Sequence, residues 1–232
     1  MKVLIISDGH GNLESLEKLA PVAAEADAIL YAGDFAALRH TETGRPFLER
    51  LAALHDRVFA VIGNCDEPEF LADLEEYDLS IEGSLSYFGG LMLSGSGGGT
   101  RFTGDTPNER SEEDLIDDLR LVAGSVPEGE PSGELWDNLV LVIHNPPKDT
   151  ALDVIPGGIH VGSALVRSFI ERYRPLLSVS GHIHESAAVD SLGPTTLVNP
   201  GPLAEGRYAL AEITGGGKTP FAVSSLTLHC LE

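Results

Sequence analysis

Cysteine, positive charge and long apolar runs are all scarce in this sequence of 232 residues. Its two cysteines, Cys65 and Cys230, are too few for a disulfide framework or for a zinc site built on thiolates. No apolar run reaches the roughly 18 to 20 residues needed to cross a bilayer. The first apolar run meets Asp8 too early for a secretory signal. We therefore expect a cytoplasmic protein without a membrane span.

The scarcity of basic residues gives the chain a strong negative charge, because 36 acidic residues stand against 15 basic ones and the formal net charge is −21. Such a surface repels nucleic acid and anionic membranes, so neither is expected as a partner. The acidic residues are spread along the chain, which favours adaptation to high salt, where screening weakens their repulsion. An ordinary acidic cytosolic protein is the alternative, and the oligomeric state is left open.

Apolar residues make up 42% of the sequence, enough for a sizeable core, and we expect one domain over residues 1–232. The first half contains continuous apolar runs at 2–7, 28–31 and 58–62, which are typical of strands buried on both faces. Helical patterns follow the first and second runs. This alternation predicts a parallel α/β sheet, in which ligands bind beyond the carboxyl ends of the strands.

The second half differs, with short apolar or alternating runs separated by glycine-rich turns. This pattern favours antiparallel pairing. Helices are expected over residues 112–122 and 163–173, and mobile loops over 95–108 and 124–133. The predicted fold class is α/β, with two packed mixed β-sheets flanked by helices.

Polar residues follow the predicted strands and are expected to meet at one edge of the fold. They are Asp8, His10, Asp34, Asn64, His144, His182 and His184. Each alone has an ordinary interpretation as a turn residue or a packed histidine, but their shared position favours a metal site. Nitrogen and oxygen ligands without a thiolate suit Mn, Fe, Zn, Co or Ni, and the set is large enough for two ions if one carboxylate bridges them.

These residues occur in blocks that resemble those of the calcineurin-like metallophosphoesterases. In chain order the blocks are Asp8-x-His10, Gly33-Asp34, Gly63-Asn64-x-Asp66, His144 and Gly181-His182-x-His184. They extend over nearly the whole chain. The resemblance implies a four-layer α/β/β/α fold and a phosphoesterase with two divalent metal ions, Mn²⁺ being expected ahead of Fe, Zn, Ni, Co or Mg.

The resemblance also assigns ligands to the two ions. It implies that one ion is bound by Asp8, His10, Asp34 and His184. It implies that the other is bound by Asp34, Asn64, His144 and His182, with Asp34 as the bridge. Attack on phosphorus by a metal-bridging hydroxide follows from this arrangement, and the locally cationic centre accepts a small phosphate-ester substrate in spite of the net charge.

Cys65 departs from the family pattern, because most members carry at this position a histidine thought to protonate the leaving oxygen. A neutral thiol is a poor acid at pH 7, so substrates with basic leaving groups are disfavoured. The chain looks like a small bacterial and archaeal branch that also lacks this histidine and resembles phosphodiesterases acting on small or nucleotide diesters. A phosphomonoesterase, a phosphoprotein phosphatase and a non-catalytic scaffold of the same fold are the alternatives. Cys65 itself is interpreted as a small, apolar, half-buried side chain, with a catalytic or redox thiol as the alternative.

Three residues outside the blocks carry further hypotheses. His160 stands in a glycine-rich loop before a helix capped by Ser163, and we expect it to approach the phosphate or its leaving group; a surface histidine is the alternative. Arg101 is expected to contact the phosphate, as is Asn64, although an ordinary exposed arginine is equally compatible with the sequence. Asn199 lies in a late turn that we interpret as structural.

Overall fold

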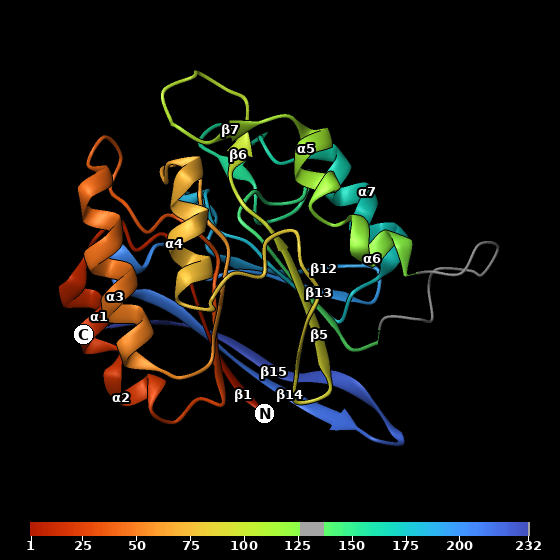
Figure 1. The fold of residues 1–232 in the computed structure, drawn as a ribbon. Helices are drawn as coiled ribbons and strands as arrows, with labels where there is room; N and C mark the ends of the chain where they lie inside the picture. Colours follow the sequence, from red (N-terminus) through yellow and green to blue (C-terminus); the bar gives the residue numbers. More distant parts are fainter. Residues whose placement is uncertain (126–136, 232) are drawn as a thin grey trace.

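Two β-sheets pack face to face, and helices cover the outer face of each, in the computed structural model of residues 1–125 and 137–231 (Figure 1). The first sheet has the strand order β15-β14-β1-β2-β3. Its strands are β1 (Lys2–Ile6), β2 (Ala28–Tyr31), β3 (Val58–Ala60), β14 (Arg207–Gly216) and β15 (Thr219–Cys230). The four helices on its outer side are α1 (Leu13–Lys18), α2 (Ala20–Ala23), α3 (Gly44–Leu54) and α4 (Leu71–Glu76).

The second sheet has the strand order β12-β13-β11-β8-β5-β4. Its strands are β4 (Ser86–Phe88), β5 (Leu91–Ser96), β8 (Leu139–Ile143), β11 (Leu177–Val179), β12 (Ala188–Leu192) and β13 (Thr195–Asn199). The helices that cover it are α5 (Glu112–Asp117), α6 (Arg120–Gly124) and α7 (Ala164–Tyr173). This four-layer α/β/β/α arrangement confirms the predicted fold class.

Strand alternation assigns the apolar side chains to the three layers of core. In β1, Leu4 and Ile6 face the helices of the first sheet, while Val3 and Ile5 face the second sheet. β8 is divided in the same way, because Val140 and Val142 pack between the sheets and its other three residues pack against α5, α6 and α7. Both central strands are buried on both faces, which explains their continuous apolar sequence.

The expectation of an antiparallel second half is wrong for the centre of the second sheet. The neighbours β5, β8, β11 and β13 pair in parallel, and only the edge strands β4 and β12 run antiparallel to their partners. A short apolar run has the same appearance in either kind of pairing. The direction is set by the connections, and helix α7 carries the chain from the end of β8 to the start of β11.

The predicted helices are present, with two interruptions, the first of which divides the helix after β1 into α1 and α2 at Leu19. The helix expected over 112–122 is divided into α5 and α6, and α5 begins with a capping box between Ser111 and Asp114. The helix expected over 163–173 is α7, and Ser163 caps it by accepting a hydrogen bond from the backbone N–H of Val166. Among the described residues no helix is both long and apolar enough to cross a membrane.

The loop predicted over 95–108 is wrong for its first residues, which are buried and extended. β5 continues to Ser96, and a side chain on Gly95 would lie 2.6 Å from the carbonyl oxygen of Val142 in the neighbouring strand. A two-stranded ribbon, β6 (Gly99–Thr100) with β7 (Glu109–Arg110), then frames an exposed connection. The loop predicted over 124–133 starts at the last residue of α6, and residues 126–133 lie outside the described part of the chain.

Candidate metal centre

The structure brings the predicted ligand residues together beyond the carboxyl ends of the strands. Two of them follow β1, one follows β2 and one follows the apolar run of β3 in the first sheet, and the others follow β8 and β11 in the second. The converging side chains are those of Asp8, His10, Asp34, Asn64, His144, His182 and His184. Parallel strands of both sheets therefore deliver their ends to one place.

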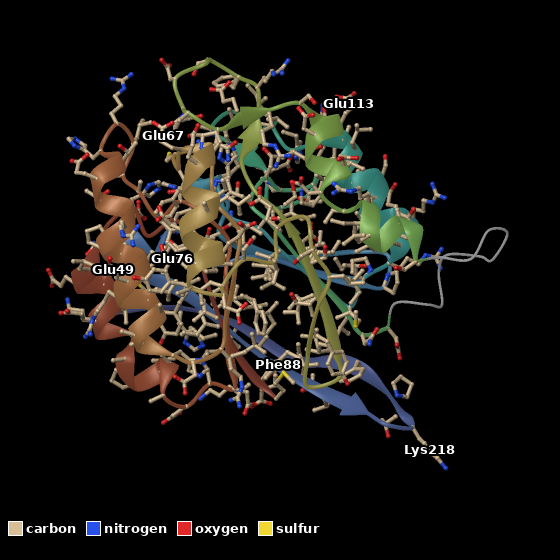
Figure 2. All side chains as sticks on the ribbon, in the orientation of Figure 1. Glu49, Glu67, Glu76, Phe88, Glu113 and Lys218 are labelled. Carbon is tan, nitrogen blue, oxygen red and sulfur yellow. The ribbon has the colours of Figure 1, made fainter. Side chains whose placement is uncertain are left out.

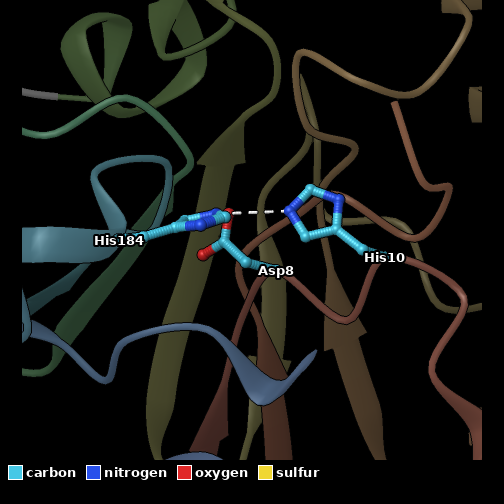
Figure 3. A group of neighbouring side chains, drawn as sticks. All are labelled: Asp8, His10 and His184. Carbon is cyan, nitrogen blue, oxygen red and sulfur yellow. Dashed lines mark hydrogen bonds and ion pairs between the residues drawn. The ribbon is translucent and has the colours of Figure 1, made fainter. Parts of the chain in front are cut away.

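Asp8, His10 and His184 form one group of side chains (Figure 3). The Nε2 atoms of the two histidines lie 3.2 Å apart, although 174 positions separate them in the sequence. His184 Nε2 is 3.5 Å from Asp8 Oδ1, and His10 Nε2 is 3.7 Å from Asp34 Oδ2. Four potential ligand atoms thus surround one small volume.

Asn64, His144 and His182 form a second group. The amide oxygen of Asn64 lies 2.8 Å from His144 Nε2 and 2.7 Å from His182 Nδ1. His144 Nε2 is also 3.6 Å from Asp34 Oδ1. Asp34 therefore faces the first group with one carboxylate oxygen and the second group with the other.

The hydrogen bonds made by the other ring nitrogen of His10 and of His144 make these side chains suitable ligands for divalent cations. His10 Nδ1 lies 3.1 Å from the carbonyl oxygen of Ala36, and His144 Nδ1 lies 2.6 Å from that of Ala32. A carbonyl only accepts, so each Nδ1 carries a proton, and in the neutral ring, which is the form that binds a metal, Nε2 presents a lone pair. On His144 that lone pair faces the amide oxygen of Asn64, which is also an acceptor, and a shared cation resolves such a contact.

Four of these residues have a left-handed backbone, which is uncommon for residues other than glycine. The φ angles are 54° for Asp8, 46° for His10, 60° for Asp34 and 69° for His182. Each such conformation costs on the order of 1 to 3 kcal/mol and persists because surrounding structure enforces it. At His182 this turn replaces the extended chain, so His182 points to the second group and His184 to the first.

Asp66 holds two of the ligand loops together, a role that sequence reasoning did not assign to it. Its buried carboxylate accepts hydrogen bonds from the backbone N–H of Gly63 (2.7 Å), Ala36 (2.8 Å) and Phe35 (3.2 Å). Burial, reinforced by the charge of Asp34, raises the pKa of Asp66 to about 6 against the effect of those donors. Its place in the block after Asn64 is the one signal that pointed to it.

The two groups have different electrostatic surroundings. Burial, reinforced by His144, lowers the pKa of His182 to about 4, so its ring is neutral at pH 7. The hydrogen bond to Asp8 raises the pKa of His184 above its ordinary value in spite of partial burial. Burial alone would raise the pKa of Asp8, but its interactions with His184 and His144 outweigh that effect and hold the pKa below its usual range.

Cys65 lies beside the centre rather than in an unrelated part of the core. Its backbone N–H donates to Asp34 Oδ1 at 2.8 Å, and its sulfur lies within 4.8 Å of the ligand atoms of His10 and Asp34. Burial, followed by the charge of Asp34, raises the pKa of the Cys65 thiol far above its ordinary value. The thiol therefore stays neutral and does not act as an acid at pH 7.

Among the described contacts of His160 none is to the seven cluster residues, and its approach to the phosphate or its leaving group stays a prediction. It lies in β10 (Ile159–His160), which pairs with β9 (Val154–Ile155), and its Nδ1 is 2.7 Å from the buried carboxylate of Asp153. Strand alternation turns His160 to the face of this hairpin opposite Ile155 and Val161. The position of His160 in the sequence, shortly before a helix, does not indicate which face of the hairpin its side chain occupies.

Arg101 lines a cavity of about 380 Å³ whose lining also includes Asn64 and His182 of the second group. Asn199 has a structural role, because its Nδ2 donates to the carbonyl oxygens of Ile183 (2.9 Å) and Gly181 (3.4 Å). It thereby fixes the turn that carries the two late histidines.

Comparisons with known proteins agree with this geometry. The sequence model of the calcineurin-like phosphoesterases matches residues 1–186. An uncharacterized protein, MJ1162 of Methanocaldococcus jannaschii, is 34% identical over 212 residues, which cover 87% of this chain and 88% of that protein.

Solved structures share the fold at low sequence identity. TT1561 of Thermus thermophilus has a TM-score of 0.71 at 19% identity. The match covers 100% of this chain and 99% of that chain. A 5'-nucleotidase of Candida albicans has a TM-score of 0.61 at 12% identity, and 100% of this chain covers 51% of it. On the family match and the relative from M. jannaschii, the chain belongs to the calcineurin-like phosphoesterase family.

Proposed function

We propose that this protein is a dinuclear metal-dependent phosphodiesterase that hydrolyses small or nucleotide diesters. The observation that carries the proposal is the position of Asp34, whose two carboxylate oxygens face two separate groups of ligand atoms. A carboxylate that faces two such groups can bridge a pair of metal ions.

The seven cluster residues divide between two ions. Asp8, His10 and His184 hold the first ion together with Asp34, and Asn64, His144 and His182 hold the second with the same carboxylate. When bound, the two ions polarise phosphoryl oxygens and make water a nucleophile near neutral pH. The chain positions them through backbone carbonyls behind His10 and His144, which fix the ring orientation. Mn²⁺ is the metal that we propose for these ligands.

The preference for diesters rests on the resemblance to the phosphodiesterase branch that also lacks the histidine at the position of Cys65, and Cys65 itself limits the leaving group. The neutral thiol beside Asp34 supplies no proton to a leaving oxygen, and the ring of His160 is directed to Asp153 instead. Esters with good leaving groups or little need for protonation are therefore the substrates that this centre serves best.

The acidic surface supports a small substrate in preference to a polyanion. Figure 2 shows Glu49, Glu67, Glu76 and Glu113 on exposed parts of several different elements, and the formal net charge is −21. We propose a cytoplasmic protein adapted to high salt, in which screening relieves this repulsion. Unfolding by urea from low to molar KCl tests this second point, and a free energy of unfolding that does not rise with salt rejects it.

The decisive experiment is metal replacement with paired substrates. We expect the chelator-stripped protein to be inactive and stepwise Mn²⁺ to restore turnover of bis-p-nitrophenyl phosphate, with saturation at two ions per chain. The monoester p-nitrophenyl phosphate should be cleaved at least about tenfold more slowly if the centre prefers diesters, and because both esters release the same p-nitrophenolate, this ratio does not depend on the missing acid. Faster cleavage of the monoester would favour a phosphomonoesterase, and a protein that binds no metal and cleaves neither ester would favour a scaffold.

A further inference from the structure

The cavity beside the second ligand group extends away from the metal centre and has a different chemical character. Asn64 and His182 form part of its lining, which places it next to the point where the phosphate binds in the proposed function. The opposite walls come from the connection between β6 and β7, which projects at the top of Figure 1, and from the β9–β10 hairpin.

The walls are mainly apolar, with hydroxyl groups among them. Ile155, Val161 and Ile183 contribute aliphatic side chains, and Phe102 contributes an aromatic ring. The hydroxyl-bearing residues are Thr100, Thr103 and Thr106. An apolar cavity with a few polar groups is typical of a small-molecule site, and a hydrated inorganic phosphate does not need one.

Phe102 is 86% exposed, the largest value among the exposed large apolar residues of the described chain. The segment that carries it is held in place by Glu109, whose carboxylate accepts hydrogen bonds from the backbone N–H of Phe102 (2.7 Å) and Gly104 (2.8 Å). At the other end of the segment, Asn145 Oδ1 accepts a hydrogen bond from the backbone N–H of Thr100 at 3.0 Å. An aromatic ring on an anchored segment, open to solvent beside a cavity, is a surface on which a planar group can stack.

Charged groups are few in the lining of the cavity. Arg101 is the one arginine or lysine among its described lining residues, and the Glu109 carboxylate accepts hydrogen bonds from backbone donors. In a protein of net charge −21, a guanidinium in this lining attracts phosphate, while the apolar side chains of the lining receive an uncharged group.

We propose that this cavity binds a planar aromatic ester group of the substrate, with Phe102 as its stacking surface and Arg101 beside the phosphate. This inference rests on the proposed function, since it names the ester that the metal centre cleaves. A nucleobase and a simple aryl group share the required chemistry. Phe102 is then a specificity-determining residue, and its removal changes which ester binds and leaves phosphate binding intact.

Binding of product-like monoesters tests the proposal independently of turnover. The affinities of adenosine 5'-monophosphate, phenyl phosphate, ribose 5-phosphate and inorganic phosphate are measured by calorimetry on the Mn²⁺-loaded protein. We expect an aromatic monoester to bind about tenfold more tightly than ribose 5-phosphate, as stacking on one ring provides. Tight binding of the nucleotide alone assigns a nucleobase, and tight binding of phenyl phosphate as well assigns any aromatic group.

Variants separate stacking from general effects. Phe102→Ala should reduce the aromatic preference to within about twofold and leave the affinities for ribose 5-phosphate and inorganic phosphate unchanged. Phe102→Tyr should retain the preference. Tyr87→Ala, at a residue in β4 that is 70% exposed and does not line the cavity, is the matched control and should behave as the unaltered protein.

Three results would overturn the proposal. They are equal affinity for all four ligands, no binding of any of them, and an equal loss of affinity for all four in Phe102→Ala. Failure of the proposed function has a different signature, because diester turnover would then be absent, or slower than monoester turnover, whether or not the aromatic preference is found.

Discussion

The metal centre and the wall of the neighbouring cavity meet at Asn64 and His182 but are built in opposite ways. The centre gathers side chains from the ends of several strands, most of them buried, and holds four of them in a left-handed backbone. The main part of the wall is one continuous segment, 100–109, which is exposed over residues 101–105. The Glu109 carboxylate holds its tip, and its ends are bound to Asn145 through Thr100 and to Gly63 and Asn64 through Asn108. The ends of strands from both sheets therefore fix the centre, whereas hydrogen bonds of one segment, local at its tip and longer-range at its ends, fix the wall.

This difference predicts that changes in the centre abolish function and that changes near the wall alter preference or stability. The largest effect is expected for Asp34→Asn, because its carboxylate faces both ligand groups. Turnover of bis-p-nitrophenyl phosphate should fall by about 10⁴, and metal content should drop from two ions toward one or none. Asp117→Asn, an exposed acidic residue that is paired with Arg120, is the matched control. Full metal content in Asp34→Asn would contradict the bridging assignment.

The next prediction concerns the two ligand groups of the centre, which His182→Ala and His184→Ala test separately. Their rings point to different ligand groups, so each variant should lose a different ion and about 10³ in turnover. Metal counting, followed by spectroscopy of the remaining ion, distinguishes the two. Loss of the same ion in both variants would mean that the adjacent histidines serve one metal.

The residue that follows the segment 100–109 gives a prediction about stability. Arg110, the last residue of β7, binds Asp118 (2.6 Å) and the carbonyl oxygen of Gly97 (3.1 Å), and lies 3.5 Å from the buried Glu82. Burial, reinforced by Asp118, raises the pKa of Glu82 to about 7 in spite of Arg110. The folded protein thus keeps this proton at pH values where the unfolded chain releases it.

The contribution of Glu82 to the free energy of unfolding should therefore fall as the pH rises from about 4.5 to about 7, by on the order of 3 kcal/mol, and should be constant above that range. Glu82→Gln carries no titrating group at this position and should lack this part of the slope. Urea unfolding of both proteins across pH 4 to 8 measures the difference. Parallel pH profiles would show that Glu82 titrates normally.

The smallest effect is expected at Cys65. Because its thiol stays neutral beside Asp34, Cys65→Ser should change turnover of an activated diester by less than about threefold. Cys65→His, by contrast, should increase turnover of an unactivated ester. A large loss in Cys65→Ser would show that the sulfur takes part in binding metal or substrate.

Much of the fold and of the centre could be predicted from the sequence because the relevant signals are local. Continuous apolar runs identified the buried strands, and Ser163 was recognisable as a helix cap from its position before an amphipathic segment. The ligand residues stood out because nitrogen and oxygen donors follow one strand after another. The parallel direction of the second sheet was missed, since apolar runs do not encode it.

The sequence by itself determined which donor atoms are available, in what order they follow the strands, and that no thiolate framework or membrane-spanning run competes with them. Only the tertiary structure decided how they are divided. Asp34 faces both groups, His182 and His184 point apart, and His160 is turned to Asp153. These outcomes depend on backbone angles and on contacts between residues as far as 174 positions apart, which packing of the two sheets sets and local pattern does not encode.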